Sequence, residues 1–220
     1  MLLLCTGKAK NIRSLLIFIY VCAILWCKII LFGIVWKGEI PLHRHHLKNA
    51  IVCAMFAALC CLATLVIQVP SPIGGYLNLG DCFVLVAAFL LGPWYGALAG
   101  GVGSALADLF GGYVQYAPGT LAIKGMMAMV AGLLCMLLAR HRRQAGAAIV
   151  RLLAAICGEC IMVLGYMVYE AWLLGYGAGA LVGLPSNLMQ AVLGITISQV
   201  LCALLLKIPG IGRHLPYINE

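Results

Sequence analysis

The sequence predicts an all-α polytopic membrane protein, with a core of six membrane-spanning helices and one further hydrophobic helix before it. Of the 220 residues, 65% are hydrophobic and only 9% are charged, whereas about a quarter of the residues in a soluble domain are charged. The mean hydropathy is +1.10. A spanning helix needs about 20 residues, so this length has room for about six or seven spans and almost no soluble domain. The composition excludes an ordinary soluble enzyme, a disordered chain and a collagen-like fibre.

Runs with few charges define the spans in chain order. The first run, Ser14 to Trp36, is interrupted by Lys28 and is followed by a polar stretch from Lys37 to Asn49. The core runs are Ile51 to Val69, Cys82 to Leu91, Trp94 to Phe110, Thr120 to Ala139, Ala147 to Leu174 and Ala178 to Leu206. The run from Cys82 is short and merges almost directly into the next one through Gly92-Pro93. These runs divide the chain into a hydrophobic segment with a basic linker (1–49), a six-helix domain (50–210) and a tail (211–220).

Basic residues alternate along the chain and predict its orientation. Lys37, Arg44 and Lys48 precede the first core run, and further basic residues follow the fourth and the sixth. The loops 70–80 and 111–119 contain no Lys or Arg. Because basic loops stay in the cytosol, we expect a multi-pass protein of the plasma membrane with both ends of the core, and hence the C-terminus, cytosolic. The net charge of +8 therefore reflects membrane topology, and we expect no nucleic-acid partner.

The segment before Trp36 leaves alternatives open. If it spans the membrane, Lys8, Lys10 and Arg13 lie outside, and the equal number of basic residues on its other flank gives no bias. It is a seventh helix, an in-plane anchor or an upstream extension. We favour the extra helix.

Polar residues gather in the predicted outer half of the core. An ionisable group within a bilayer is costly and needs a reason. Asp81, Asp108, Lys124 and Glu170 lie near the outer ends of their runs, and only Glu159 lies near the middle. This asymmetry indicates a pocket that opens outward above an apolar plug. The expected ligand-binding residues are Tyr76, Asn78, Asp108, Tyr116, Lys124, Tyr166, Glu170, Asn187 and Gln190.

The same residues also fit a structural role. Tyr and Trp are common at membrane interfaces, and paired charges can serve only to hold helices together. Asp108 and Lys124, in particular, are candidates for pairing with each other. We favour a binding site because Lys124, Glu170 and Asn187 all fall at one level of the membrane.

Small residues form two stripes with a spacing of four. Gly92, Gly96 and Gly100 continue into Ser104 and Asp108, and a second, shorter stripe consists of Ala54 and Ala58. Small residues at this spacing let helices approach closely. We interpret the glycine stripe as internal packing, because Asp108 ends it. The alanines fit either packing or the docking of a partner.

Chemistry-bearing motifs are largely missing. The 11 cysteines lie mostly in apolar runs, where a thiol behaves as a small hydrophobe. We expect no metal site at Cys157 and Cys160 or in the basic stretch around His43. The sequence has no Walker A pattern, and its core runs contain no histidine to serve as a base for a serine nucleophile. We therefore expect neither an enzyme nor a cofactor.

Three stretches resemble a known family. They are G-G-Y-L-N-L-G-D from Gly74, L-L-G-P-W-Y-G-A-L-A-G-G-V-G-S-A-L-A-D-L from Leu90, and Y-A-P-G-T-L-A-I-K-G from Tyr116. They resemble the substrate-binding S components of energy-coupling factor (ECF) transporters, in the riboflavin-type or hydroxymethylpyrimidine/pyridoxine-type branch. The similarity is strongest over residues 50–138 and continues more weakly to Leu206, while residues before about Ile40 lie outside the pattern.

This resemblance implies an importer subunit with a six-helix fold and a vitamin site near the outer face. Its implied partners are a transmembrane coupling subunit and two ATP-binding-cassette (ABC) ATPases. The family's A-x-x-x-A motif, which contacts the coupling subunit, corresponds here to Ala54 and Ala58. The loop over residues 70–80 would cover the substrate, and the whole subunit would topple to deliver it.

The expected substrate is a vitamin or precursor of the pyridoxine, hydroxymethylpyrimidine, riboflavin or thiamin class. Charges of both signs in the predicted pocket suggest a small aminated or pyridine-like ring. The alternatives are an integral-membrane enzyme, which would turn over without any ATPase, and a structural membrane protein with no transport ligand, which would tolerate Lys124→Ala.

Overall fold

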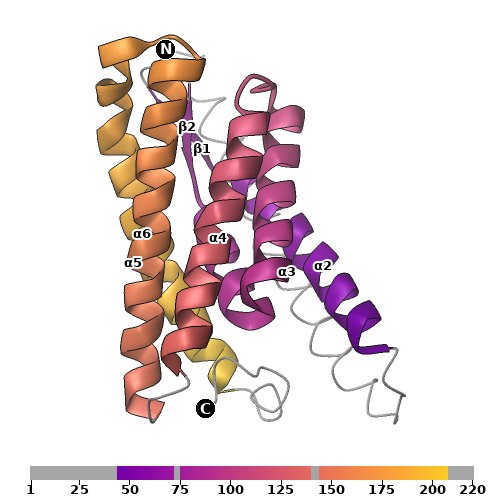
Figure 1. Ribbon diagram of the computed structural model, residues 1–220. Helices are drawn as coiled ribbons and strands as arrows, with labels where there is room; N and C mark the ends of the chain where they lie inside the picture. The colour runs from indigo at the N-terminus through magenta and orange to yellow at the C-terminus, as the bar shows by residue number, and fades with distance from the viewer. Residues whose placement is uncertain (1–43, 72–74, 140–143, 208–220) are drawn as a thin grey trace, which may run out of the picture. The chain divides into compact units, whose positions relative to one another are not determined.

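The computed structural model describes residues 44–71, 75–139 and 144–207, which form a helical bundle with one short hairpin (Figure 1). The N-terminal helix expected before Trp36 and the predicted tail over 211–220 lie outside these residues. The elements in chain order are α2 (Arg44–Val66), β1 (Gln68–Pro70), β2 (Tyr76–Asn78), α3 (Gly80–Gly111), α4 (Ala117–Ala139), α5 (Gln144–Val168), a π-helical turn (Tyr169–Leu173), a 3-10 helix (Gly177–Gly183) and α6 (Leu184–Leu206).

Within the described residues, five helices are long and apolar enough to cross a membrane, where the sequence predicts six core spans. The difference lies in α3, which contains both the second and the third predicted run. Gly92 interrupts it with φ 76° and ψ −174°, a conformation open to glycine, and Pro93 follows.

The two arms of α3 run antiparallel about Gly92. A Cβ added at Gly96 would lie 2.6 Å from Ala88 Cα, and one at Gly100 would lie 2.7 Å from a methyl group of Val84. These contacts require the chain to fold back on itself. The first arm, Gly80–Leu91, is only about 18 Å long, less than the hydrocarbon thickness of about 30 Å. Both ends of α3, with Asp81 and Asp108, therefore lie at the same end of the bundle.

The glycine stripe packs inside the bundle, as the sequence predicts. All of its members from Gly92 to Asp108 are buried. Beside the stripe, Gly103 leaves no room for a Cβ against the carbonyl oxygen of Ala57 in α2, and a Cβ at Gly101 would lie 2.8 Å from the Leu121 carbonyl oxygen in α4. Figure 1 shows α4 between α3 and α5, and α6 beside α5.

The segment after α2 differs from the prediction. The first core run was expected to continue as a helix to Val69, but α2 ends at Val66. Gln68–Pro70 then pairs antiparallel with Tyr76–Asn78. We call this pair the β1–β2 hairpin, and the end of the bundle beside it the hairpin end.

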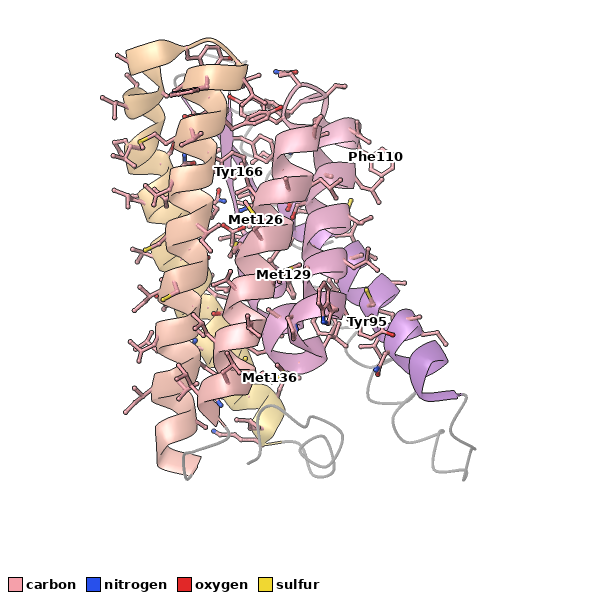
Figure 2. The ribbon with its side chains drawn as sticks, in the orientation of Figure 1. Tyr95, Phe110, Met126, Met129, Met136 and Tyr166 are labelled. Atoms are coloured by element: carbon pink, nitrogen blue, oxygen red, sulfur yellow. The ribbon has the colours of Figure 1, made fainter. Side chains whose placement is uncertain are left out.

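The outer surface of the helices is apolar. Trp94 is 75% exposed, Phe110 72% and Trp172 84%. Figure 2 shows Phe110 pointing away from the bundle, while Tyr166 lies among the helices at the hairpin end. Large exposed apolar areas of this kind mark a surface covered by lipid or protein.

Candidate functional site

A polar pocket lies at the hairpin end, and every ligand-binding residue that the sequence predicts lines it. They are Tyr76, Asn78, Asp108, Tyr116, Lys124, Tyr166, Glu170, Asn187 and Gln190. Sequence reasoning missed five further lining residues: Thr64, Ser71, Gly75, Ser104 and Thr120. Four of these five carry hydroxyl groups. A search for Ser and Thr within or next to the apolar runs would have found those four.

A buried ion pair lies at the base of this pocket, and its lysine lines the pocket. Lys124 Nζ donates to Asp81 Oδ1, and both side chains are about 1% exposed. The pairing of Asp108 with Lys124, left open by the sequence, is therefore wrong. Because Gly100 faces Val84 across the two arms of α3, Asp108 lies about one turn nearer the hairpin than Asp81, and Lys124 pairs with the deeper carboxylate.

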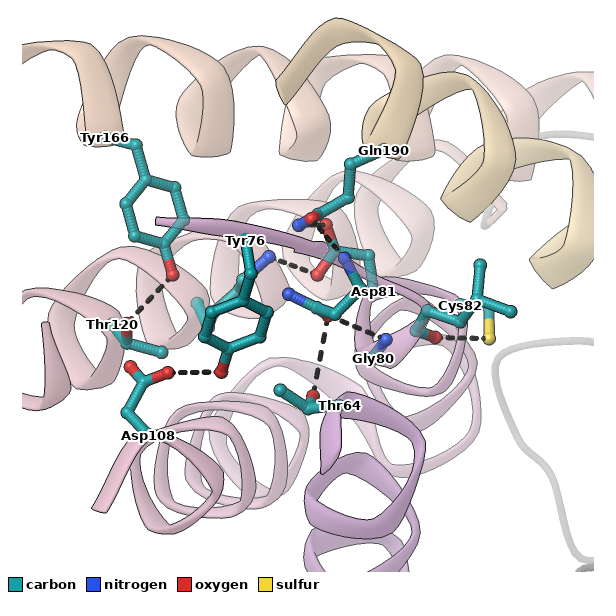
Figure 3. A network of polar contacts seen from close by, with 12 residues as sticks. Thr64, Tyr76, Gly80, Asp81, Cys82, Asp108, Thr120, Tyr166 and Gln190 are labelled. Atoms are coloured by element: carbon teal, nitrogen blue, oxygen red, sulfur yellow. Dashed lines mark hydrogen bonds and ion pairs between the residues drawn. The ribbon is translucent and has the colours of Figure 1, made fainter. Parts of the chain in front are cut away.

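A chain of hydrogen bonds connects this ion pair to the hairpin (Figure 3). Gln190 Nε2 donates to Asp81 Oδ2 at 2.7 Å, and Gln190 Oε1 accepts from the backbone N–H of Asn78 at 2.8 Å. Asn78 Oδ1 in turn accepts from the Gly80 N–H at 2.8 Å. Four elements, α4, α3, α6 and β2, are thus joined by one buried polar network.

A second group of contacts lies nearer the hairpin. Tyr76 donates its hydroxyl hydrogen to Asp108 Oδ1 at 2.5 Å, and the Thr120 and Tyr166 hydroxyls are 2.9 Å apart. Burial, with the nearby Asp108 carboxylate, raises the pKa of Tyr76 above its ordinary value. Its phenol is therefore a neutral hydrogen-bond donor at physiological pH.

Tyrosine rings cluster beside the pocket, and two of them, Tyr76 and Tyr116, line it. The Tyr76 and Tyr113 ring centroids are 4.5 Å apart, and Tyr116 lies 6.5 Å from Tyr113 and 6.3 Å from Tyr169. Tyr116 also donates to Glu170 Oε1 at 3.4 Å. Such a series of ring faces suits a planar ligand.

Several buried polar atoms in the pocket have no protein partner among the described residues. They are Asp108 Oδ2, Glu170 Oε2 and Ser104 Oγ. Buried polar groups are nearly always hydrogen-bonded, so these atoms are positioned to bind water or a ligand. Two of the three are carboxylate oxygens, which makes the pocket rich in acceptors.

The pocket is narrow. Its free volume is about 30 Å³, which is room for about two waters. The hairpin is held against α6 by the Ser71 and Ser186 hydroxyls, 3.2 Å apart, as well as by the Asn78–Gln190 bond. A ring-sized ligand therefore needs this pocket to enlarge.

The expected partner-binding alanines lie on a surface. Ala54 and Ala58 are both exposed, one turn apart on α2, whereas Cys53, Phe56 and Cys60 face the interior. Within the described residues, no group of three or more His, Cys, Asp or Glu side chains is close enough to hold a metal ion.

Known proteins that this chain resembles are transport proteins and one protein of undescribed function. A family model described as "ECF-type riboflavin transporter, S component" matches residues 44–207. A protein of Pyrococcus woesei, described as "Uncharacterized protein in gap 3'region", is 38% identical over 147 residues, which cover 66% of this chain and 93% of that protein. The thiamine precursor transporter HmpT of Lactococcus lactis subsp. cremoris is 29% identical over 137 residues, which cover 62% of this chain and 74% of HmpT. The crystal structure at 2.1 Å of an S-component for biotin from an ECF-type ABC transporter covers 80% of this chain and is itself covered in full, with a TM-score of 0.44 and 19% identity.

Proposed function

The chain belongs to the family of ECF-type riboflavin transporter S components, and we propose that its pocket at the hairpin end captures a single-ring vitamin precursor. As a member it is a multi-pass membrane protein, the substrate-binding component of an importer for a vitamin or precursor, and not an enzyme. The observation that carries the proposal is the convergence of polar and aromatic side chains from separate helices on one pocket of an otherwise apolar bundle.

The proposed substrate class rests on the size and chemistry of the pocket. A cavity of about 30 Å³ has to enlarge less for one ring than for the three fused rings of a flavin. The free oxygens of Asp108 and Glu170 are acceptors that suit amino and hydroxyl groups on such a ring. The relative HmpT is a thiamine precursor transporter, and we extend that class of substrate to this chain.

The proposed route of entry is through the hairpin. The Ser71–Ser186 and Asn78–Gln190 contacts break, which frees the hairpin to move. The ligand then stacks on the tyrosines, and the two contacts re-form over it. The alternation of basic loops supports placing this end outside the cell and the C-terminus in the cytosol.

Delivery needs partners in this proposal. A transmembrane coupling subunit docks on the face of α2 that carries Ala54 and Ala58, and two ABC ATPases drive the toppling of the subunit. The exposure of both alanines supports this role, because small exposed residues let a partner helix approach closely.

The test begins with the ligand. The protein is purified in mild detergent without added vitamins and denatured, and the released small molecules are identified by mass spectrometry. We expect a stoichiometric aminated pyrimidine or pyridine. Saturable binding of that compound by the isolated protein, with uptake only when the coupling subunit and ATPases are co-expressed, completes the test. A preparation that is empty and shows no thermal shift with any B vitamin or precursor contradicts the proposal.

A further inference from the structure

Among the described residues, three charged side chains line the pocket, and one of these three is a cation. Lys124 carries the positive charge, and Asp108 and Glu170 carry the negative ones. Lys124 is 1% exposed and its ammonium contacts Asp81, which does not itself line the pocket. The positive charge is therefore balanced from beneath, on the side away from a ligand.

The geometry at Asp81 holds this balance in place. Its second oxygen accepts from Gln190 Nε2 at 2.7 Å, so the carboxylate cannot turn away from Lys124 without losing that bond. An ammonium has three N–H groups, and Asp81 accepts one of them in the described structure. In the described structure the other two N–H groups are left for acceptors on a ligand, such as a ring nitrogen or a hydroxyl oxygen.

The two remaining charges in the pocket are not balanced in this way. Asp108 and Glu170 each use one oxygen to accept from a tyrosine, and their other oxygens are buried without a partner among the described residues. A ligand phosphate carries about −1.5 to −2 charge at neutral pH. Within the narrow pocket it would lie near two carboxylates, and the described part of the chain offers no unneutralised cation there. Such an arrangement of like charges is strongly unfavourable at low dielectric.

We propose that Asp81 sets the charge specificity of the site: by neutralising Lys124 from beneath, it makes the pocket accept neutral or cationic ring compounds and reject their phosphate esters. This inference rests on the proposed function. It assigns to Asp81 a positioning role that acts through Lys124 and involves no contact with the ligand. If Asp81 were only structural, its replacement would weaken the binding of every ligand by the same factor. In the proposed role, its replacement changes the ratio between the affinity for a parent compound and the affinity for its phosphate ester.

The experiment measures that ratio. The full chain in detergent is titrated with matched pairs: 4-amino-5-hydroxymethyl-2-methylpyrimidine and its monophosphate, thiamin and thiamin monophosphate, and pyridoxine and pyridoxine 5′-phosphate. For the pair whose parent compound binds, we expect the parent to bind at least about 100-fold more tightly than the ester, as two like charges at low dielectric predict. In Asp81→Asn, which frees the Lys124 charge, we expect this ratio to fall by about 10-fold or more, equal to about 1.4 kcal/mol.

Two further variants separate charge from folding. Asp81→Asn with Lys124→Met removes both charges, and we expect the ratio to return towards that of the unmodified protein. Breaking a buried ion pair is strongly destabilising, so the second variant leaves the Asp81–Lys124 pair intact. Asp108→Asn with Glu170→Gln removes the free carboxylates, and we expect the ratio to fall although Asp81 and Lys124 are unchanged.

The outcomes distinguish this inference from the function on which it rests. If no parent compound or ester binds the unmodified protein, the proposed vitamin site itself is wrong. If a parent compound binds but its ester binds equally well, the site stands and the charge specificity is overturned. The specificity is also overturned if folded Asp81→Asn weakens the parent and its ester by the same factor, or if Asp108→Asn with Glu170→Gln leaves the ratio unchanged.

Discussion

The backbone N–H of Asn78 donates to the side-chain oxygen of Gln190 at 2.8 Å, across 112 positions of the sequence. This bond fixes β2 to α6 directly above the Asp81–Lys124 pair, because the same amide of Gln190 donates to Asp81. Gln190 is 2% exposed. One side chain thus connects the cover of the pocket to its base.

Gln190→Ala is expected to weaken ligand retention. The change leaves the Asn78 N–H and one Asp81 oxygen without these partners, at a cost of about 1–3 kcal/mol for each buried group. Because the hairpin then opens more often, we expect ligand dissociation to accelerate by about 10-fold or more, with a smaller change in association. Stopped-flow fluorescence with the compound that is released from the denatured protein measures both rates.

The matched control is Thr196→Ala on the same helix. The Thr196 hydroxyl only donates to the Val192 carbonyl within α6, and the residue is exposed. We expect the rate of ligand dissociation from Thr196→Ala to stay within about twofold of the rate for the unmodified protein, because most surface substitutions have small effects. Equal rates for Gln190→Ala and the unmodified protein would show that the hairpin is not held by this bond.

The antiparallel turn in α3 predicts that Gly96→Ala is destabilising. The new methyl group would lie 2.6 Å from the Ala88 Cα and 3.0 Å from its backbone nitrogen. Backbone atoms cannot move aside as a flexible side chain can, so the arms must separate. We expect a loss of about 1–3 kcal/mol of stability, as for other overpacked sites. Thermal unfolding in detergent, followed by circular dichroism, gives the shift.

Gly125→Ala provides the comparison within a helix. A Cβ there would lie 3.7 Å from the Ala97 carbonyl oxygen, an ordinary contact. Alanine is favoured over glycine in a helix by about 1 kcal/mol, so we expect an unchanged or higher melting temperature. If both variants melt alike, the two arms of α3 do not pack as closely as described.

Much of this site was predictable from the level of each residue along its helix. Tyr76, Lys124 and Gln190 were placed at one end of the bundle because loop charge gives the direction of each span, and residue number then gives the depth. The partner of Lys124 was not predictable in this way. Asp81 and Asp108 lie near the two ends of α3 and differ in depth by only about one turn, so depth estimated from residue number does not choose between them.

The hairpin was missed for a different reason. Each strand has three residues, which are too few for an alternating pattern to show, and β1 ends in a proline, Pro70. The apolar residues that end α2 continue through Ile67 and Val69, so the pattern favoured a longer helix. Pairing with Tyr76–Asn78 and the Asn78–Gln190 bond are tertiary interactions, which a local pattern does not contain.

Tyr76 predicts a specific dependence of stability on alkaline pH. Burial and Asp108 raise the pKa of Tyr76 in the folded protein above its usual value of 10.0. Its contribution is therefore fully present below about pH 10 and is lost above it, because the unfolded chain releases this proton first. We expect Tyr76→Phe to lose less stability than the unmodified protein between about pH 10 and 11, by up to about 1.4 kcal/mol per pH unit.

Melting temperatures in detergent from about pH 7 to pH 11 measure this difference. Below about pH 9 the two proteins should keep a constant offset, which reports the lost hydrogen bond to Asp108. Parallel curves over the whole range would mean that the Tyr76 phenol ionises as readily in the folded protein as in the unfolded chain.

The exposed alanines of α2 predict a separation of binding from transport. Ala54 and Ala58 face outward and contribute nothing to the pocket, so Ala58→Leu adds bulk only to the proposed docking face. Close helix contact depends on small residues, and we expect uptake by cells that express the coupling subunit and ATPases to fall by about 10-fold or more. Ligand affinity of the isolated protein should stay the same.

Ala148→Leu is the matched control, because Ala148 is also an exposed alanine on an apolar helix, α5. If α2 is the docking face, this second leucine leaves both uptake and the co-purification of the coupling subunit unchanged, whereas Ala58→Leu reduces both together. Equal loss of uptake in the two variants would instead indicate that bulk anywhere on the surface hinders movement in the membrane. Full uptake in Ala58→Leu would place the docking face on another helix.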